Sequence, residues 1–183
     1  MSQPHPHAPI RTDRLELRPV GPEHEADFVA FYGDPEVMAI RKYGVMDADR
    51  AREQHAKLMA HWDKHGFGMY AVFVDDVFAG EAGLRWRDDS PEVEISYGLL
   101  SAFRGQGYAT EAALTSLRIG FEEHGLGEIV AYTVPANRAS LRVMEKIGMH
   151  RDTDGDFEHP GLPDGHGLGP MVLYRIARDD FVT

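Results

Sequence analysis

A short glycine-rich segment constrains this chain more than any other feature. The run Arg104-Gly105-Gln106-Gly107-Tyr108-Ala109 lies between a strand-like segment, Glu92 to Leu100, and a helix-like segment, Thr110 to His124. Gly105 and Gly107 allow positive φ and carry no Cβ to block a ligand. Several backbone N–H groups can then converge at the amino end of the helix, where the helix dipole favours an anion. The segment predicts a phosphate-binding loop or, failing that, a tight turn before a helix.

A second informative pair of segments follows at the distance expected within one supersecondary unit. A strand-like run, Glu128 to Val134, leads into Asn137-Arg138-Ala139-Ser140 and then Glu145-Lys146-Ile147-Gly148-Met149. Together with the glycine-rich loop, these segments resemble the GNAT superfamily of N-acetyltransferases. The opening Arg11 to Pro19 and the strand-like Ile95 to Leu99 resemble its RimJ/RimL-like branch. The resemblance extends from Ile10 to Ala177.

The resemblance implies a mixed α/β sheet, formed as one domain with a splayed central strand. It implies acetyl-CoA as cofactor, a primary amine on a small molecule or peptide as acceptor, and direct transfer in a ternary complex. The residues that it places on the cofactor are Leu99, Leu100, Arg104, Gly105, Gln106, Gly107, Tyr108, Ala109, Thr110, Asn137 and Ser140. A non-catalytic acyl-CoA-binding or regulatory module is the alternative function.

Three residues are candidates for the chemistry. The resemblance implies that the backbone N–H of Leu99 stabilises the oxyanion. Many family members carry a Tyr seven residues after the Asn as the acid for the thiolate; this chain has Met144 there, so Ser140 becomes the candidate donor. Glu94 stands on the central strand and is either the base or a solvated strand carboxylate; Glu81 is the weaker alternative base, and water is a third route. Asn137 is equally suited to be a helix N-cap.

Composition excludes several other classes of protein. The 183 residues are 43% apolar and contain no cysteine, which excludes disulfides and thiolate chemistry. The net charge of −11 argues against a general nucleic-acid surface, and no apolar run is long enough to cross a membrane. We expect a cytoplasmic protein with a loose tail at residues 1–9 and one domain at 10–178, and a homodimer is the oligomeric state to test.

Periodicity and turn residues predict the order β-α-α-β-β-β-α-β-α-β-β. Besides the segments above, we expect elements at Leu15 to Arg18, Pro22 to Gly33, Asp47 to His65, Met69 to Val74, Val77 to Leu84 and Pro170 to Ala177. Asp75 and Asp76 predict a hairpin turn. In the first helix, Ala26, Val29 and Ala30 are apolar positions at helical spacing, with Phe28 and Phe31 flanking them. In the later helix, Ala113, Leu114, Leu117 and Phe121 lie on one stripe that we expect to pack on the sheet.

Two irregular segments and the histidines complete the prediction. Met38 to Val45 and Phe157 to Gly169 are expected loops that line the acceptor side. His61 and His65 share a helix face, but no Glu lies between them in a zinc-protease pattern, so no metal site is predicted.

Overall fold

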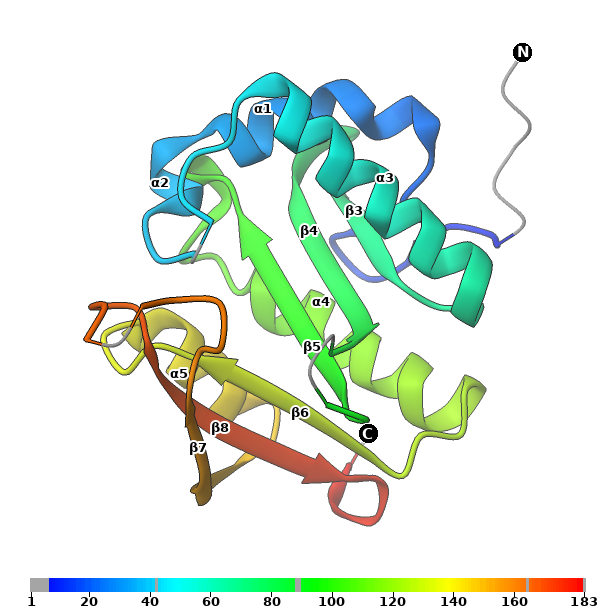
Figure 1. Ribbon diagram of the computed structural model, residues 1–183. Coiled ribbons are helices and arrows are strands. Elements are labelled where there is room, and N and C mark those ends of the chain that lie inside the picture. Colours follow the sequence, from blue (N-terminus) through cyan, green and yellow to red (C-terminus); the bar gives the residue numbers. More distant parts are fainter. Residues whose placement is uncertain (1–6, 42, 88–89, 164, 183) are drawn as a thin grey trace.

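The computed structural model describes residues 7–41, 43–87, 90–163 and 165–182, and these form a mixed α/β sheet, as predicted. Eight strands lie in the order β1-β2-β3-β4-β5-β6-β8-β7 (Figure 1). They are β1 (Ile10–Arg11), β2 (Glu16–Pro19), β3 (Met69–Val74), β4 (Val77–Trp86), β5 (Val93–Leu99), β6 (Glu128–Thr133), β7 (His150–Glu158) and β8 (Pro170–Ala177). All neighbours are antiparallel except β5 and β6.

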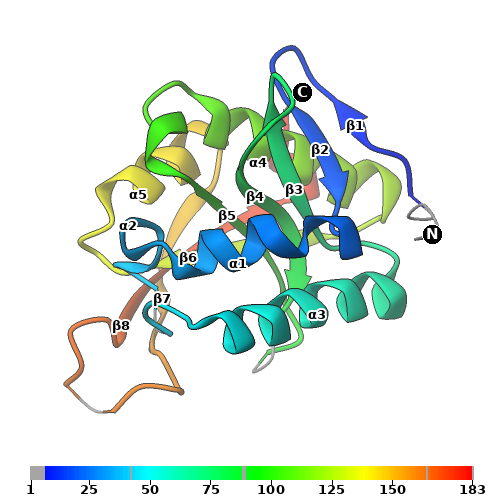
Figure 2. The ribbon, with the colours of Figure 1, turned by 90° about the horizontal axis from the view of Figure 1, so that it is seen from above.

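The helices form a layer on each face of the sheet (Figure 2). One layer contains α1 (Glu25–Gly33), α2 (Pro35–Met38) and α3 (Ala48–His65), which pack on β2, β3 and β4 around a core that includes Phe28 and Phe31. The other contains α4 (Tyr108–Arg118) and α5 (Arg138–Lys146), which pack over β4 to β6 and β8 around Leu117 and Ile129. Short 3-10 turns are η1 (Pro22–His24), η2 (Ser101–Phe103) and η4 (Arg178–Asp180).

Local signals in the sequence set several boundaries correctly. Asp75 and Asp76 adopt φ of 48° and 61° and form the hairpin turn between β3 and β4. Asp47 caps α3 by accepting a hydrogen bond from Arg50 N at 2.9 Å, and Gly66 ends that helix at φ 72°. Asn137 caps α5 in the same way through Ser140 N at 3.2 Å.

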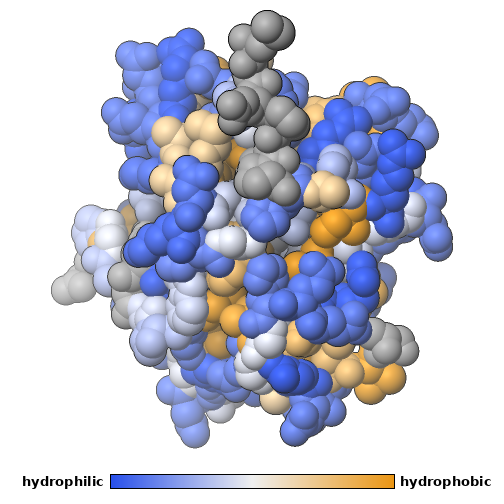
Figure 3. Space-filling view, turned by 90° about the vertical axis from the view of Figure 1, so that its right-hand side faces the viewer, coloured by the Kyte–Doolittle hydropathy of each residue, from blue (hydrophilic) through white to orange (hydrophobic). Residues whose placement is uncertain are grey.

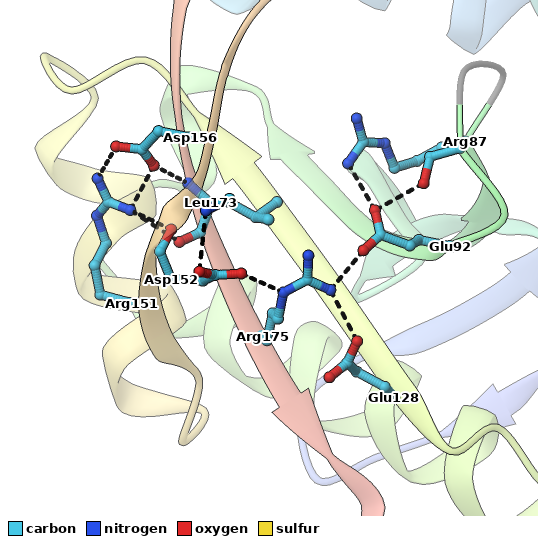
Figure 4. Close-up of polar contacts among 10 residues, drawn as sticks. Arg87, Glu92, Glu128, Arg151, Asp152, Asp156, Leu173 and Arg175 are labelled. Carbon is cyan, nitrogen blue, oxygen red and sulfur yellow. Dashed lines mark hydrogen bonds and ion pairs between the residues drawn. The ribbon is translucent and has the colours of Figure 1, made fainter.

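The central strands β5 and β6 separate along their length, which creates the site. Their register contains one partnered pair, Glu94 and Val130. At the end where both strands begin, Arg175 of β8 binds Glu92 immediately before β5, Glu128 of β6 and Asp152 of β7 (Figure 4). Because the strands are tied at this end, they diverge toward their carboxyl ends (Figure 1).

Some boundaries and buried faces differ from the prediction. Helix α4 begins two residues earlier, at Tyr108, and becomes a π-helical turn, η3 (Ile119–Glu123), after Arg118. The expected loop at Phe157 instead begins in β7, because Phe157 pairs with Met171. Leu114 is 37% exposed, against the prediction, while Ala113, Leu117 and Phe121 are buried.

Residues 1–6 of the expected tail lie outside the described residues, as do Lys42 and Asp164 of the two expected loops. His7 packs on the ring of Trp62 in α3, with the ring centroids 4.9 Å apart. The face at the right-hand side of Figure 1 is mostly hydrophilic, with hydrophobic residues visible between the polar ones (Figure 3).

Candidate functional site

The glycine-rich loop has the geometry that its sequence predicts. Gly105 and Gly107 have φ of 76° and 84°, and α4 starts immediately after Gly107. In the described part of the chain, the backbone N–H groups from Gly105 to Thr110 have no hydrogen-bond acceptor. Unpaired amides at the positive end of a helix fit a pyrophosphate. Tyr108, Ala109 and Thr110 belong to the first turn of that helix.

Two polar side chains of the loop bind the protein itself. Arg104 donates from Nε to the carbonyl oxygen of Leu99 at 2.9 Å, and from Nη2 to that of Glu36 at 3.2 Å. Gln106 donates from Nε2 to the carbonyl oxygen of Ala102 at 3.1 Å. Arg104 therefore fixes the loop to the end of β5.

The backbone of Leu99 faces the gap between β5 and β6. Leu100 N donates to Ala79 O at 2.9 Å, on the side of β4. Because successive N–H groups of a strand point to opposite sides, the N–H of Leu99 points away from β4. It faces the opening where β6 has diverged, so it is available to a ligand that lies between the strands.

One cavity contains three of the predicted site residues, among them the candidate base and the candidate proton donor. Glu94, Asn137 and Ser140 line it, whereas Leu99, Leu100 and the loop residues Arg104 to Ala109 do not. The two expected acceptor-side segments contribute to its wall. Its other lining residues include Tyr32, Met38, Ile40, Arg41, Tyr43, Glu81, Arg85, Tyr97, Tyr132, Met144 and His159.

Glu94 is a buried carboxylate with one oxygen unpaired. Its residue is 3% exposed, and Oε1 accepts a hydrogen bond from Arg85 Nε of the neighbouring strand. Oε2 is buried and has no hydrogen-bond partner among the described residues. Burial, and next the charge of Glu94, raise the pKa of Tyr132, so this phenol beside Glu94 stays protonated. An unpaired buried acceptor is costly unless a ligand satisfies it.

Glu81, the alternative base, has both oxygens occupied. Tyr32 donates to Oε2 at 2.7 Å and Arg41 donates to Oε1 at 2.6 Å. The guanidinium of Arg41 occupies the space over Gly98 where any larger residue would place its Cβ. Gly98 stays in register with Glu81, so it marks neither a bulge nor a bend against β4.

Ser140 lies on α5, on the face of the sheet opposite Glu94. Tyr97 Oη lies 3.1 Å from Ser140 Oγ and donates to Ser140 O at 3.2 Å. Burial raises the pKa of Tyr97 to about 12. Asn137 donates from Nδ2 to Thr133 Oγ1 at 2.9 Å while it caps the helix. Met144 is buried beside the cavity.

Sequence reasoning missed Tyr97, Arg85 and Arg41 as members of the site. Arg85 had a usable signal, since it stands opposite Glu94 when the hairpin is paired around its turn. Tyr97 and Arg41 had no such signal in the sequence. Tyr97 contacts Ser140, 43 residues away in the chain, and Arg41 contacts Glu81, 40 residues away.

The histidines of α3 serve the fold. His61 Nε2 accepts from Trp86 N at 3.0 Å, so its Nδ1 carries the proton that is donated to Phe67 O at 2.8 Å. The described residues contain no group of three His, Asp or Glu placed to hold a metal ion. Within the same residues, no helix has the length and apolar character that crossing a membrane requires.

Comparison with known proteins identifies the family. The sequence model for the "Acetyltransferase (GNAT) domain" matches residues 14–150. The chain is 33% identical to the "FsC-acetyl coenzyme A-N(2)-transacetylase" of Aspergillus fumigatus, over 94% of this chain and 77% of that protein. A GNAT acetyltransferase structure from Bacillus anthracis has a TM-score of 0.78 at 27% identity, covering 94% of this chain and 99% of the other.

A structure of RimL, an L7/L12 alpha-N-protein acetyltransferase in complex with coenzyme A, shares the fold. Its TM-score is 0.75 at 19% identity, and 93% of this chain and 98% of that chain are covered. The chain is thus a GNAT acetyltransferase-domain protein, and the RimJ/RimL-like resemblance of its sequence is matched by structures of the same fold.

Proposed function

We propose that this protein transfers an acetyl group from acetyl-CoA to a primary amine within a ternary complex. The observation that carries the proposal is the unpaired Oε2 of Glu94, buried in the cavity that Ser140 also lines. Acetyl-CoA supplies an activated acetyl thioester. The amides of residues 105–110 suit its pyrophosphate, and the gap beside Leu99 suits its extended arm.

The transfer also requires a base for the amine, a hydrogen-bond donor for the oxyanion and a proton for the departing sulfur, and we assign each of these to a group of the protein. Glu94 accepts the proton that the amine must lose, because its Oε2 has no hydrogen-bond partner among the described residues. The N–H of Leu99 donates to the acetyl carbonyl oxygen as that oxygen gains charge. Ser140 donates its hydroxyl proton to the departing sulfur. Base and donor lie on opposite faces of the sheet, so amine and cofactor approach from different sides.

The first experiment measures acetyl-CoA-dependent thiol release across an amine panel. Peptides with free amino termini, amino acids, polyamines and aminoglycosides form the panel, together with FsC, which the name of the Aspergillus fumigatus relative mentions. The protein has no cysteine, so it adds no thiol background. Saturable release with one class of amine supports the proposal.

Paired variants assign the base. Glu94→Gln keeps an acceptor for Arg85 but cannot take a proton, so kcat/KM should fall about 100-fold. Glu81→Gln makes the same change at a carboxylate whose oxygens are both occupied, and should reduce kcat/KM far less. A larger loss of kcat/KM in Glu81→Gln than in Glu94→Gln would assign the role of base to Glu81.

Acetyl-CoA binding without turnover of any amine would favour the alternative function, a regulatory module, which the presence of Met144 in place of the family's Tyr suggests.

A further inference from the structure

The segment between β1 and β2 contacts the helix that follows the glycine-rich loop. Thr12 and Arg14 belong to the opening segment Arg11 to Pro19, which the proposed chemistry does not use. Both residues bind Glu111, almost one hundred positions later in the chain, in the first turn of α4. The contact therefore connects the edge of the sheet to the start of the proposed phosphate site.

Glu111 receives four hydrogen bonds or ion-pair contacts from these two residues. Its Oε1 accepts from Thr12 Oγ1 at 2.6 Å and from Arg14 N at 3.0 Å. Its Oε2 accepts from Arg14 Nε at 2.7 Å and lies 2.6 Å from Arg14 Nη2. The carboxylate is thus held as an anion. Burial opposes this, but the hydrogen bonds from Thr12 and Arg14 keep the pKa of Glu111 below its ordinary value.

The same guanidinium also contacts the loop. Arg14 Nη1 donates to Gln106 O at 2.8 Å, and the guanidinium carbon lies 4.8 Å from the centre of the Tyr108 ring. In a trans peptide the C=O and the next N–H point in opposite directions. Holding Gln106 O toward Arg14 therefore turns the N–H of Gly107 away from it, where that N–H is free for an anion.

The charges explain why an arginine is needed here. One guanidinium spans the distance between Glu111 and the loop, so the carboxylate lies very near the proposed pyrophosphate position. An unneutralised carboxylate there would repel a phosphate. Resting on the proposed function, we infer that Arg14 is a positioning residue for the cofactor: it neutralises Glu111 and orients the Gln106–Gly107 peptide for anion binding.

Acetyl-CoA binding measured by isothermal titration calorimetry tests the inference without an acceptor. Arg14→Ala should weaken binding roughly tenfold, the size of one charge-assisted hydrogen bond. Arg14→Ala with Glu111→Gln removes both charges and should recover binding to within about threefold of wild type. Arg11→Ala is the matched control: it removes a charge from the same segment, but Arg11 is 81% exposed and pairs with Glu16, so binding should not change.

Each outcome decides a different question. Wild-type protein that binds no acetyl-CoA would refute the proposed function, and with it this inference. If wild-type protein binds acetyl-CoA and Arg14→Ala binds it with equal affinity, only the inference is refuted. The inference is also refuted if the double variant binds acetyl-CoA no more tightly than Arg14→Ala does. If Arg14→Ala does not fold, Arg14→Lys serves instead. It keeps the positive charge but loses the planar set of guanidinium donors, so its affinity for acetyl-CoA should be lower than that of wild type without being lost.

Discussion

The hydroxyl of Tyr97 lies 3.1 Å from Oγ of Ser140, across the gap between β5 and α5. This phenol stands on the central strand, so the position of the proposed proton donor depends on the strand that also carries Glu94. With a pKa of about 12, raised by burial, Tyr97 is a poor acid toward a thiolate whose own pKa is near that of a free thiol. We expect Tyr97 to hold Ser140 in position.

The first prediction separates the two hydroxyls. Ser140→Ala should lower kcat about tenfold, a modest loss because a thiolate leaves without strong assistance. Tyr97→Phe should lower kcat less, without changing the shape of the pH–rate profile, since Tyr97 stays protonated below about pH 11. Steady-state thiol release from pH 6 to 10 checks both. Ser116→Ala is the control and should keep its activity, because Ser116 is a buried serine of α4 whose Oγ donates to Ala112 O.

The second prediction concerns the space over Gly98. Gly98→Ala would force Arg41 Nη2 to move, because the new Cβ would collide with it. The 2.6 Å pair with the buried Glu81 would then be lost. We expect a loss of about 2 kcal/mol in the free energy of unfolding, less than for a fully buried pair because the Arg41 side chain is 25% exposed.

Urea denaturation measures this loss, and a second glycine provides the control. Gly127 has open space where a Cβ would be, so Gly127→Ala should be neutral or slightly stabilising. Equal stability of Gly98→Ala and wild type would show that the Arg41–Glu81 pair contributes little to the fold.

Features governed by local rules were predictable from the sequence. The turn at Asp75 and Asp76, the caps Asp47 and Asn137, and the glycine-rich loop each depend on a few consecutive residues. For these, the backbone conformation that a residue tolerates is enough to place it.

Features that depend on residues far apart in the chain were not predictable from the sequence. In α1, the apolar positions were expected at Ala26, Val29 and Ala30, with Phe28 and Phe31 only flanking them. Instead, Phe28 and Phe31 are fully buried and both alanines are exposed. Large aromatic side chains gain more from burial than alanine, so the sheet selects that face. The same limit applies to Arg14 and Glu111, whose contact arises only when β1 and β2 reach the edge of the sheet.

The third prediction concerns the ionic cluster where β5 and β6 begin. Arg175 binds Glu92, Glu128 and Asp152 there (Figure 4). Although burial acts in the opposite direction, hydrogen bonds from Arg175 and Ser90 lower the pKa of Glu92. A carboxylate whose pKa is lowered on folding stabilises the fold above its unfolded pKa, about 4.3 for Glu, and this stability is lost as the pH falls through the folded value.

Wild-type stability should therefore decrease between about pH 5 and pH 3, and Arg175→Met should show a smaller decrease because Glu92 then titrates closer to its ordinary range. Above pH 5 the variant should melt a few degrees lower, about 3 °C for a chain of this size if the cluster is worth roughly 1 kcal/mol. Thermal melts followed by circular dichroism at pH 3 to 7 test both statements.

Arg142→Met removes an exposed arginine that has no ion-pair partner among the described residues, and should leave the pH dependence unchanged. If Arg175→Met and wild type lose stability in parallel as the pH falls, then Arg175 does not hold the pKa of Glu92 down, and the closed end of the β5–β6 gap must be stabilised by its apolar packing instead.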